Sequence, residues 1–153
     1  MIIELAKNRV QQIIERKGYK FFEKGDYNLN IIGIRSEVSI ANRFDDTLLC
    51  IFKKNNEWIF NEYRITTDAG KYWLKNPMNN KGTNTIDKGM FGINIHRSNP
   101  ATESTIVEKW SAGCQVFKKV KEFNEFISDC KEASSIWGNK FSYTLLTYND
   151  LRK

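Results

Sequence analysis

Two apolar and aromatic runs separated by a short polar stretch constrain the fold of this chain more than any other feature. Residues 47–53 and 58–66 are rich in β-branched and aromatic side chains, and Lys-Asn-Asn-Glu joins them. This pattern is typical of two antiparallel strands connected by a tight turn. A β-hairpin at the centre of a sheet is therefore the first prediction.

Helical and strand-like periods predict further elements around this hairpin. Apolar residues at helical spacing predict amphipathic helices up to Gly18 at the start of the chain and from Val120 to near Gly138. The remaining segments are predicted as strands (28–34, 90–96, 110–117 and 140–148), a cleft-lining loop (68–89) and a polar crossover (97–108). We therefore expect one strand-dominated α+β domain over residues 1–153.

The composition narrows the choice of partners. A net charge of +6, from 24 basic and 18 acidic residues, would attract polyanions such as nucleic acid, acidic wall polymers or anionic lipid. The basic residues are scattered and no nucleic-acid motif is present, so we expect no specific nucleic-acid partner. No apolar run reaches the ~20 residues of a membrane span, and the N-terminus does not read as a secretory signal. We expect a monomer that is synthesised in the cytoplasm.

The single histidine and one of the three cysteines form the best candidate for catalysis. Cys50 falls in a predicted strand and Cys130 on the apolar stripe of a helix, so both are expected in the core. Cys114 instead has polar, glycine-containing surroundings and follows His96 by eighteen residues. An imidazole that takes the proton of a nearby thiol makes it a strong nucleophile. Strand alternation places Asn94 on the same face as His96, where it could orient the ring.

The order of the pair excludes several classes of cysteine site. Papain-like peptidases carry cysteine before histidine, and no histidine follows Cys114. Sortases have an arginine after the cysteine, but the only arginine beyond Cys114 is Arg152, next to the last residue. One histidine without paired cysteines cannot supply an ordinary zinc site, so we expect no metal and no cofactor.

The residues around the pair resemble a known signature. His96, fourteen residues and then Ser111-Ala112-Gly113-Cys114 are similar to the L,D-transpeptidase catalytic domain (the YkuD type), in which a histidine precedes Ser/Thr-His-Gly-Cys by a similar interval. Ala112 replaces the second histidine of that signature. The segments around the two catalytic positions also resemble a phage-borne branch. The resemblance implies an L,D-transpeptidase-like β-sandwich, here with an N-terminal helix and a helix after the cysteine.

The resemblance implies a role for each neighbouring residue. Cys114 would attack an amide carbonyl, with His96 accepting its proton and later protonating the leaving amine. The backbone N–H groups of Gly113 and Cys114 would form an oxyanion hole, and Ser111 would bond within the turn or orient the imidazole. Arg97 is a candidate for binding a substrate carboxylate, with solvent exposure as the alternative. Trp110 is a candidate for the wall of the cleft or the core.

These observations predict a cysteine-dependent amide hydrolase or acyl-transferase acting on peptidoglycan stem peptides through an acyl-enzyme. Hydrolysis and transfer share that intermediate, and the choice between them stays open. The protein would act at the cell wall once released or delivered. Because Ala112 replaces a family histidine, the alternative is a non-catalytic wall-binding or structural phage module that keeps the fold.

Overall fold

The predicted hairpin forms and lies at the centre of a sheet. In the computed structural model, which describes residues 2–37, 43–67, 94–107 and 114–152, strand β2 (Asp46–Lys54) pairs antiparallel with β3 (Glu57–Thr66) along its whole length. Asn55 and Asn56 form the turn with φ values of 53° and 64°. This left-handed backbone matches the twist of a two-residue hairpin turn, and asparagine tolerates it.

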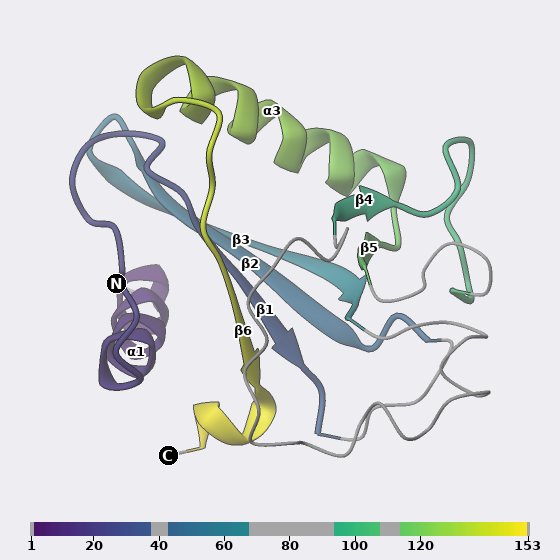
Figure 1. The fold of residues 1–153 in the computed structure, drawn as a ribbon, viewed down its shortest axis with the longest axis horizontal. Coiled ribbons are helices and arrows are strands. Elements are labelled where there is room, and N and C mark those ends of the chain that lie inside the picture. The colour runs from purple at the N-terminus through teal and green to yellow at the C-terminus, as the bar shows by residue number, and fades with distance from the viewer. Residues whose placement is uncertain (1, 38–42, 68–93, 108–113, 153) are drawn as a thin grey trace.

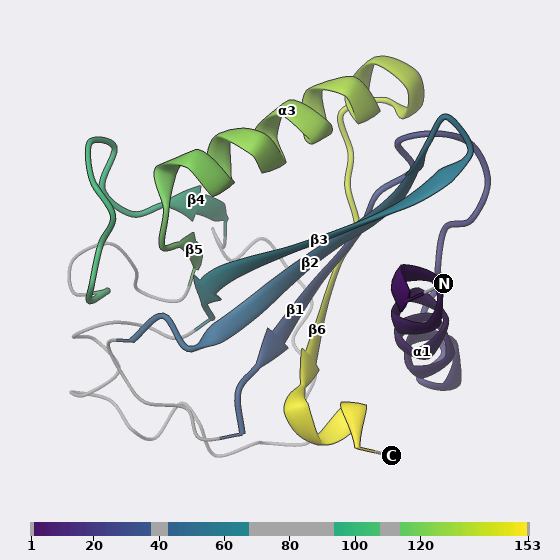
Figure 2. The same ribbon diagram turned by 180° about the vertical axis from the view of Figure 1, so that it is seen from behind.

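The described strands belong to one mixed sheet in the order β4-β5-β3-β2-β1-β6. β1 and β6 extend the hairpin on one side, and β5 and β4 extend it on the other (Figures 1 and 2). Both outermost pairs, β1 with β6 and β4 with β5, are parallel, whereas the inner pairs are antiparallel. The strand bounds are β1 (Asn30–Arg35), β4 (Ile95–Arg97), β5 (Gln115–Phe117) and β6 (Tyr143–Thr147).

Two helices cover opposite faces of this sheet (Figures 1 and 2). Helix α1 (Ile2–Arg16) packs aliphatic side chains against β1 and β2, and α3 (Val120–Trp137) covers the other face. A short 3-10 helix, η3 (Tyr148–Leu151), follows β6 beside α1. Each helix therefore buries the apolar stripe that its periodicity predicted.

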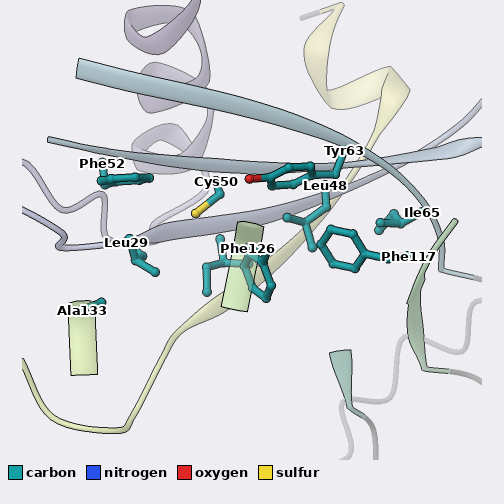
Figure 3. Close-up of a cluster of buried hydrophobic side chains, with 10 residues drawn as sticks. Leu29, Leu48, Cys50, Phe52, Tyr63, Ile65, Phe117, Phe126 and Ala133 are labelled. Atoms are coloured by element: carbon teal, nitrogen blue, oxygen red, sulfur yellow. The ribbon is translucent and has the colours of Figure 1, made fainter. Parts of the chain in front are cut away.

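The core on the α3 face is rich in aromatic residues. Figure 3 shows side chains from β2, β3, β5 and α3 gathered into one cluster. Phe117 of β5 is fully buried at its centre, with ring centres of Tyr63, Phe123 and Phe126 between 5.3 and 5.5 Å away. This cluster fixes the position of the short strand β5, which has only three residues.

The structure confirms the α+β class, both helices and the hairpin. Residues 98–107 contain no helix or strand, as predicted for the crossover, but Arg97, which was predicted to begin it, belongs to β4. The final strand is shorter than residues 140–148. The loop predicted over residues 68–89 lies outside the described residues, as do the first parts of the strands predicted at 90–96 and 110–117. The described strands form a single sheet, so the two-sheet sandwich stays a prediction. Within the described part of the chain, no helix is long and apolar enough to cross a membrane.

Candidate active site

The strand that carries His96 and the strand that begins directly after Cys114 lie side by side at one edge of the sheet. β4 runs parallel to β5, and His96 is paired with Val116. The backbone N–H of Gln115 donates to the carbonyl of Asn94 at 2.9 Å, which continues the pairing toward Cys114. The fold thus joins two segments that are eighteen residues apart in the sequence.

Cys114 and His96 lie on the same face of the sheet. Paired residues of neighbouring strands share a face, so His96 lies on the side of Val116. Cys114 comes two residues before Val116, and both pack with the buried side chains of Phe44 and Val107. Cys114, which directly precedes β5, and His96 of β4 therefore occupy diagonal positions on one face, and both residues are half-buried.

The imidazole of His96 is oriented by a backbone carbonyl. Its Nδ1 lies 2.8 Å from the carbonyl oxygen of Arg97. Because a carbonyl can only accept a hydrogen bond, Nδ1 carries the hydrogen in this contact. In the neutral ring, Nε2 then holds the free lone pair and is the atom able to accept a proton.

The three cysteines differ in their surroundings. Cys50 is buried in β2, and burial raises the pKa of its thiol well above the usual value. Cys130 on α3 packs against the same core, where burial, followed by the charge of Asp129, raises the pKa of its thiol to about 12. Both thiols stay protonated at neutral pH. The predicted core position is confirmed for Cys50, whereas Cys130 is partly buried against the edge of that core. Cys114 instead directly precedes β5, two residues before Val116, which is the strand partner of His96.

Arg97 and Asn94 have different relations to the pair. The guanidinium of Arg97 lies on the opposite face, with Cζ 5.8 Å from the centre of the Phe123 ring. Arg97 therefore contacts His96 through its backbone carbonyl, and its side chain is not brought to the thiol. Asn94 is exposed and precedes β4, where alternation keeps it on the same face as His96.

Three predicted site residues lie outside the described residues: Gly113, Ser111 and Trp110. The same holds for Ala112, which departs from the family signature. The oxyanion hole, the orientation of the imidazole by Ser111 and the cleft wall at Trp110 stay predictions.

A contact that sequence reasoning missed fixes the residue after the candidate nucleophile. The hydroxyl of Tyr143 on β6 donates to Oε1 of Gln115 at 2.7 Å, and Gln115 is buried. The Tyr143 ring passes over Gly33 of β1 so closely that a Cβ at this position would overlap the tyrosine hydroxyl. Gln115 and Cys114 point to opposite faces, so this bond fixes the backbone next to the thiol without contacting the thiol itself. A lone glycine in an apolar strand signals such a close approach.

A buried carboxylate secures the end of the sheet next to β5. Asp46, which is 1% exposed, accepts hydrogen bonds from the N–H of Ser36 and from the N–H and hydroxyl of Thr67, at 2.8, 2.6 and 2.6 Å. The Arg35 side chain donates to the same threonine hydroxyl at 3.0 Å. These bonds tie together β1, β2 and the end of β3, and Thr66 there pairs with Val116. The network thereby supports the strand that leads back to Cys114.

The described residues provide no cluster for a metal ion. Across residues 2–37, 43–67, 94–107 and 114–152, no three His, Cys, Asp or Glu side chains are grouped at metal-binding distance.

Comparisons with protein-family models, with curated proteins and with solved structures found no match.

Proposed function

We propose that this protein is a cysteine-dependent amide hydrolase or acyl-transferase with Cys114 as nucleophile and His96 as base. The observation that carries the proposal is the shared face of His96, on β4, and Cys114, which directly precedes the parallel strand β5. The Nδ1 contact to a backbone carbonyl adds to it, because it directs the basic Nε2 away from the backbone. The proposal thus rests on geometry as well as on spacing in the sequence.

The chemistry follows from these groups. His96 accepts the thiol proton as Cys114 Sγ attacks an amide carbonyl, and the tetrahedral intermediate forms. The intermediate collapses with cleavage of the C–N bond, and His96 returns the proton to the leaving amine. The resulting thioester is resolved by water in a hydrolase or by an acceptor amine in a transferase. N–H groups of Gly113 and Cys114 are the proposed donors to the oxyanion.

Peptidoglycan stem peptides are the proposed substrate class. Two features support it: the Ser-x-Gly-Cys signature after His96, and a net charge of +6, which suits an acidic wall. The enzyme would act on the wall after release or delivery. Because Ala112 stands where the resembled family has a histidine, a wall-binding module without turnover is the second candidate.

Muropeptide analysis tests the substrate. Purified protein, Cys114→Ala and Cys130→Ala are each incubated with peptidoglycan, and the released muropeptides are identified by mass. We expect shortened or exchanged stem peptides with the wild type and Cys130→Ala, and none with Cys114→Ala. Unchanged muropeptides together with sedimentation on walls would instead support the binding module.

Thiol reactivity tests the pair independently of any substrate. Iodoacetamide labelling at about pH 6, mapped by mass spectrometry, should modify Cys114 faster than free cysteine, because thiolate reacts and thiol does not. Cys130 in the same molecule is the internal control. The substitution His96→Gln should remove the advantage of Cys114. Equal labelling rates in the wild type and this variant would refute the role of the histidine.

A further inference from the structure

A cavity on the α1 face is unrelated to the candidate active site. It has a volume of about 450 Å³, which lies within the range of small-molecule sites. Its floor is the apolar surface of the sheet at Ile34, Leu49 and Phe60, and its walls are helix α1 and the C-terminal helix η3. This cavity is suited to an apolar group of a ligand.

Basic side chains dominate one end of this cavity. A second cavity of about 290 Å³ shares Arg9, Leu151 and Arg152 with the first and adds Gln12, Ile13 and Arg16 to the lining. Arg9 and Arg152 thus line both cavities and Arg16 lines the second, and the described lining of the second cavity includes no carboxylate side chain. A negatively charged group is the complementary ligand for this end.

Two of the arginines are held in place. Arg9 donates to the backbone carbonyl of Leu151 at 2.6 Å. Arg152 donates to Glu37 at 2.9 Å, and its guanidinium lies 5.0 Å from the centre of the Tyr148 ring. Each guanidinium has five N–H donors, so these contacts fix the groups and leave donors for a ligand.

The positions of nearby acidic side chains indicate how a ligand with one charged end would be oriented in these cavities. Glu37 partly offsets the charge of Arg152, and Asp150 is paired with Lys17 at 2.8 Å. Glu62 lines the first cavity and is absent from the lining of the second. A charged head group is therefore favoured at the arginines, and an apolar tail is favoured over the sheet.

We propose that these joined cavities bind a single-chain lipid phosphate, with the phosphate on Arg9, Arg16 and Arg152 and the chain over the sheet. Forked guanidinium donors match phosphate oxygens, and a phosphate monoester carries more charge for three arginines than a carboxylate does. The first turns of α1 expose Ile2 and Leu5 beside this wall, which provides an apolar approach. The inference does not rest on the proposed catalytic function.

Binding of dodecyl phosphate below its micelle concentration, measured by calorimetry and by the rise in Tm, tests the proposal. We expect saturable binding to the wild type, and much weaker binding of inorganic phosphate and of dodecyl maltoside. The substitutions Arg9→Gln and Arg152→Gln together should weaken binding at least about tenfold, because each removes a positive charge and its hydrogen-bond donors from the phosphate. Lys121→Gln with Lys131→Gln, on α3, removes the same charge and should leave binding unchanged.

Two further variants test the apolar part of the first cavity. Ala6→Phe and Thr47→Leu each place a larger side chain into the first cavity, and at least one should reduce dodecyl phosphate binding while the circular dichroism spectrum stays native. Equal affinity for inorganic and dodecyl phosphate would overturn the proposal in favour of an adventitious anion site. Unchanged binding in the double arginine variant would also overturn it. So would binding confined to anionic vesicles, which would indicate a membrane surface contact.

Discussion

The polar side chains on the two faces of the sheet differ in their burial and in their neighbours. On the α3 face, the thiols of Cys50 and Cys130 and the hydroxyls of Tyr63 and Tyr143 are packed into the core, and burial raises the pKa of all four groups. On the other face, Cys114 stays half-exposed next to His96. One face therefore holds these four groups protonated within its packing, whereas the other face carries the half-buried thiol that we propose as the nucleophile.

The largest effect we expect is on stability in alkali. The unfolded chain loses thiol protons above about pH 8.5 and phenol protons above about pH 10, whereas the folded α3 face retains them to higher pH. The unfolded state therefore binds fewer protons, and the free energy of unfolding falls as the pH rises through this window. Urea unfolding between about pH 8 and 12 measures the slope. The substitutions Cys130→Ala and Tyr63→Phe should flatten it, and an unchanged slope would contradict the role of the α3 face.

The next largest effect should come from Phe117→Ala. Removing this fully buried ring from the aromatic cluster should cost about 3–5 kcal/mol in the free energy of unfolding. Val116→Ala, one residue earlier and facing the other way, should cost less, about 0.5–3 kcal/mol. Chemical denaturation compares the two variants. If Val116→Ala is the more damaging, the α3 face does not dominate the stability of β5.

The substitution Gly33→Ala is expected to lower the free energy of unfolding by a smaller amount. The new methyl group must displace the Tyr143 ring, and such overpacking costs about 1–3 kcal/mol. The displaced ring would release Gln115, so labelling of Cys114 by iodoacetamide should slow as well. In a Tyr143→Ala background the same substitution should cost much less. If the losses of unfolding free energy from Gly33→Ala and Tyr143→Ala simply add, the absence of a side chain at position 33 is not needed to accommodate the Tyr143 ring.

Tyr143→Phe should have a modest effect on stability and a separate effect on the thiol. Loss of one hydrogen bond to buried Gln115 should cost about 0.5–1.5 kcal/mol. If this bond positions β5, the pH dependence of Cys114 labelling should also change, which a purely structural loss would not produce. The exposed Tyr148→Phe is the matched control for both readouts. Identical labelling profiles for wild type and Tyr143→Phe would exclude a positioning role.

The smallest effect is expected from Arg97→Gln. The guanidinium contacts Phe123 at a solvent-exposed site, where a cation–π contact is worth about 0.5–1 kcal/mol. The backbone carbonyl that holds His96 is unchanged, so muropeptide release should stay within about threefold of the wild type, a difference below about 1 kcal/mol. A loss of activity greater than tenfold would return Arg97 to the substrate-binding residues.

Local patterns predicted the parts of this fold that depend on neighbours in the sequence. The hairpin and both helices follow from periodicity and turn chemistry, and alternation placed His96 on the face opposite Ile95. Alternation also places Arg97 with Ile95, away from the thiol. Its assignment to the substrate was based on its position next to His96 in the chain, which does not determine the direction of a side chain.

Contacts between distant segments could not be predicted in this way. Tyr143 reaches Gln115 only because β6 returns beside β1, and no periodicity in either segment encodes that pairing. Asp46 is a buried anchor at the start of β2, because its partner Thr67 is brought to it at the end of β3. In both cases the sequence shows a polar residue, but the strand order of the sheet determines which residue becomes its hydrogen-bond partner.

The pairing of β6 with β1 also has a consequence for the order in which the parts of the sheet form during synthesis. Ile31 pairs with Tyr143, so this contact closes a very long stretch of chain, whereas the β2–β3 hairpin closes only a few residues. Long-range pairings form slowly because the entropy of loop closure must be overcome first. During synthesis, the strand that bears Cys114 leaves the ribosome before Tyr143 can hold Gln115. We therefore expect nascent chains that lack β6 to carry an unreactive thiol, so that reactivity appears only when the sheet is complete.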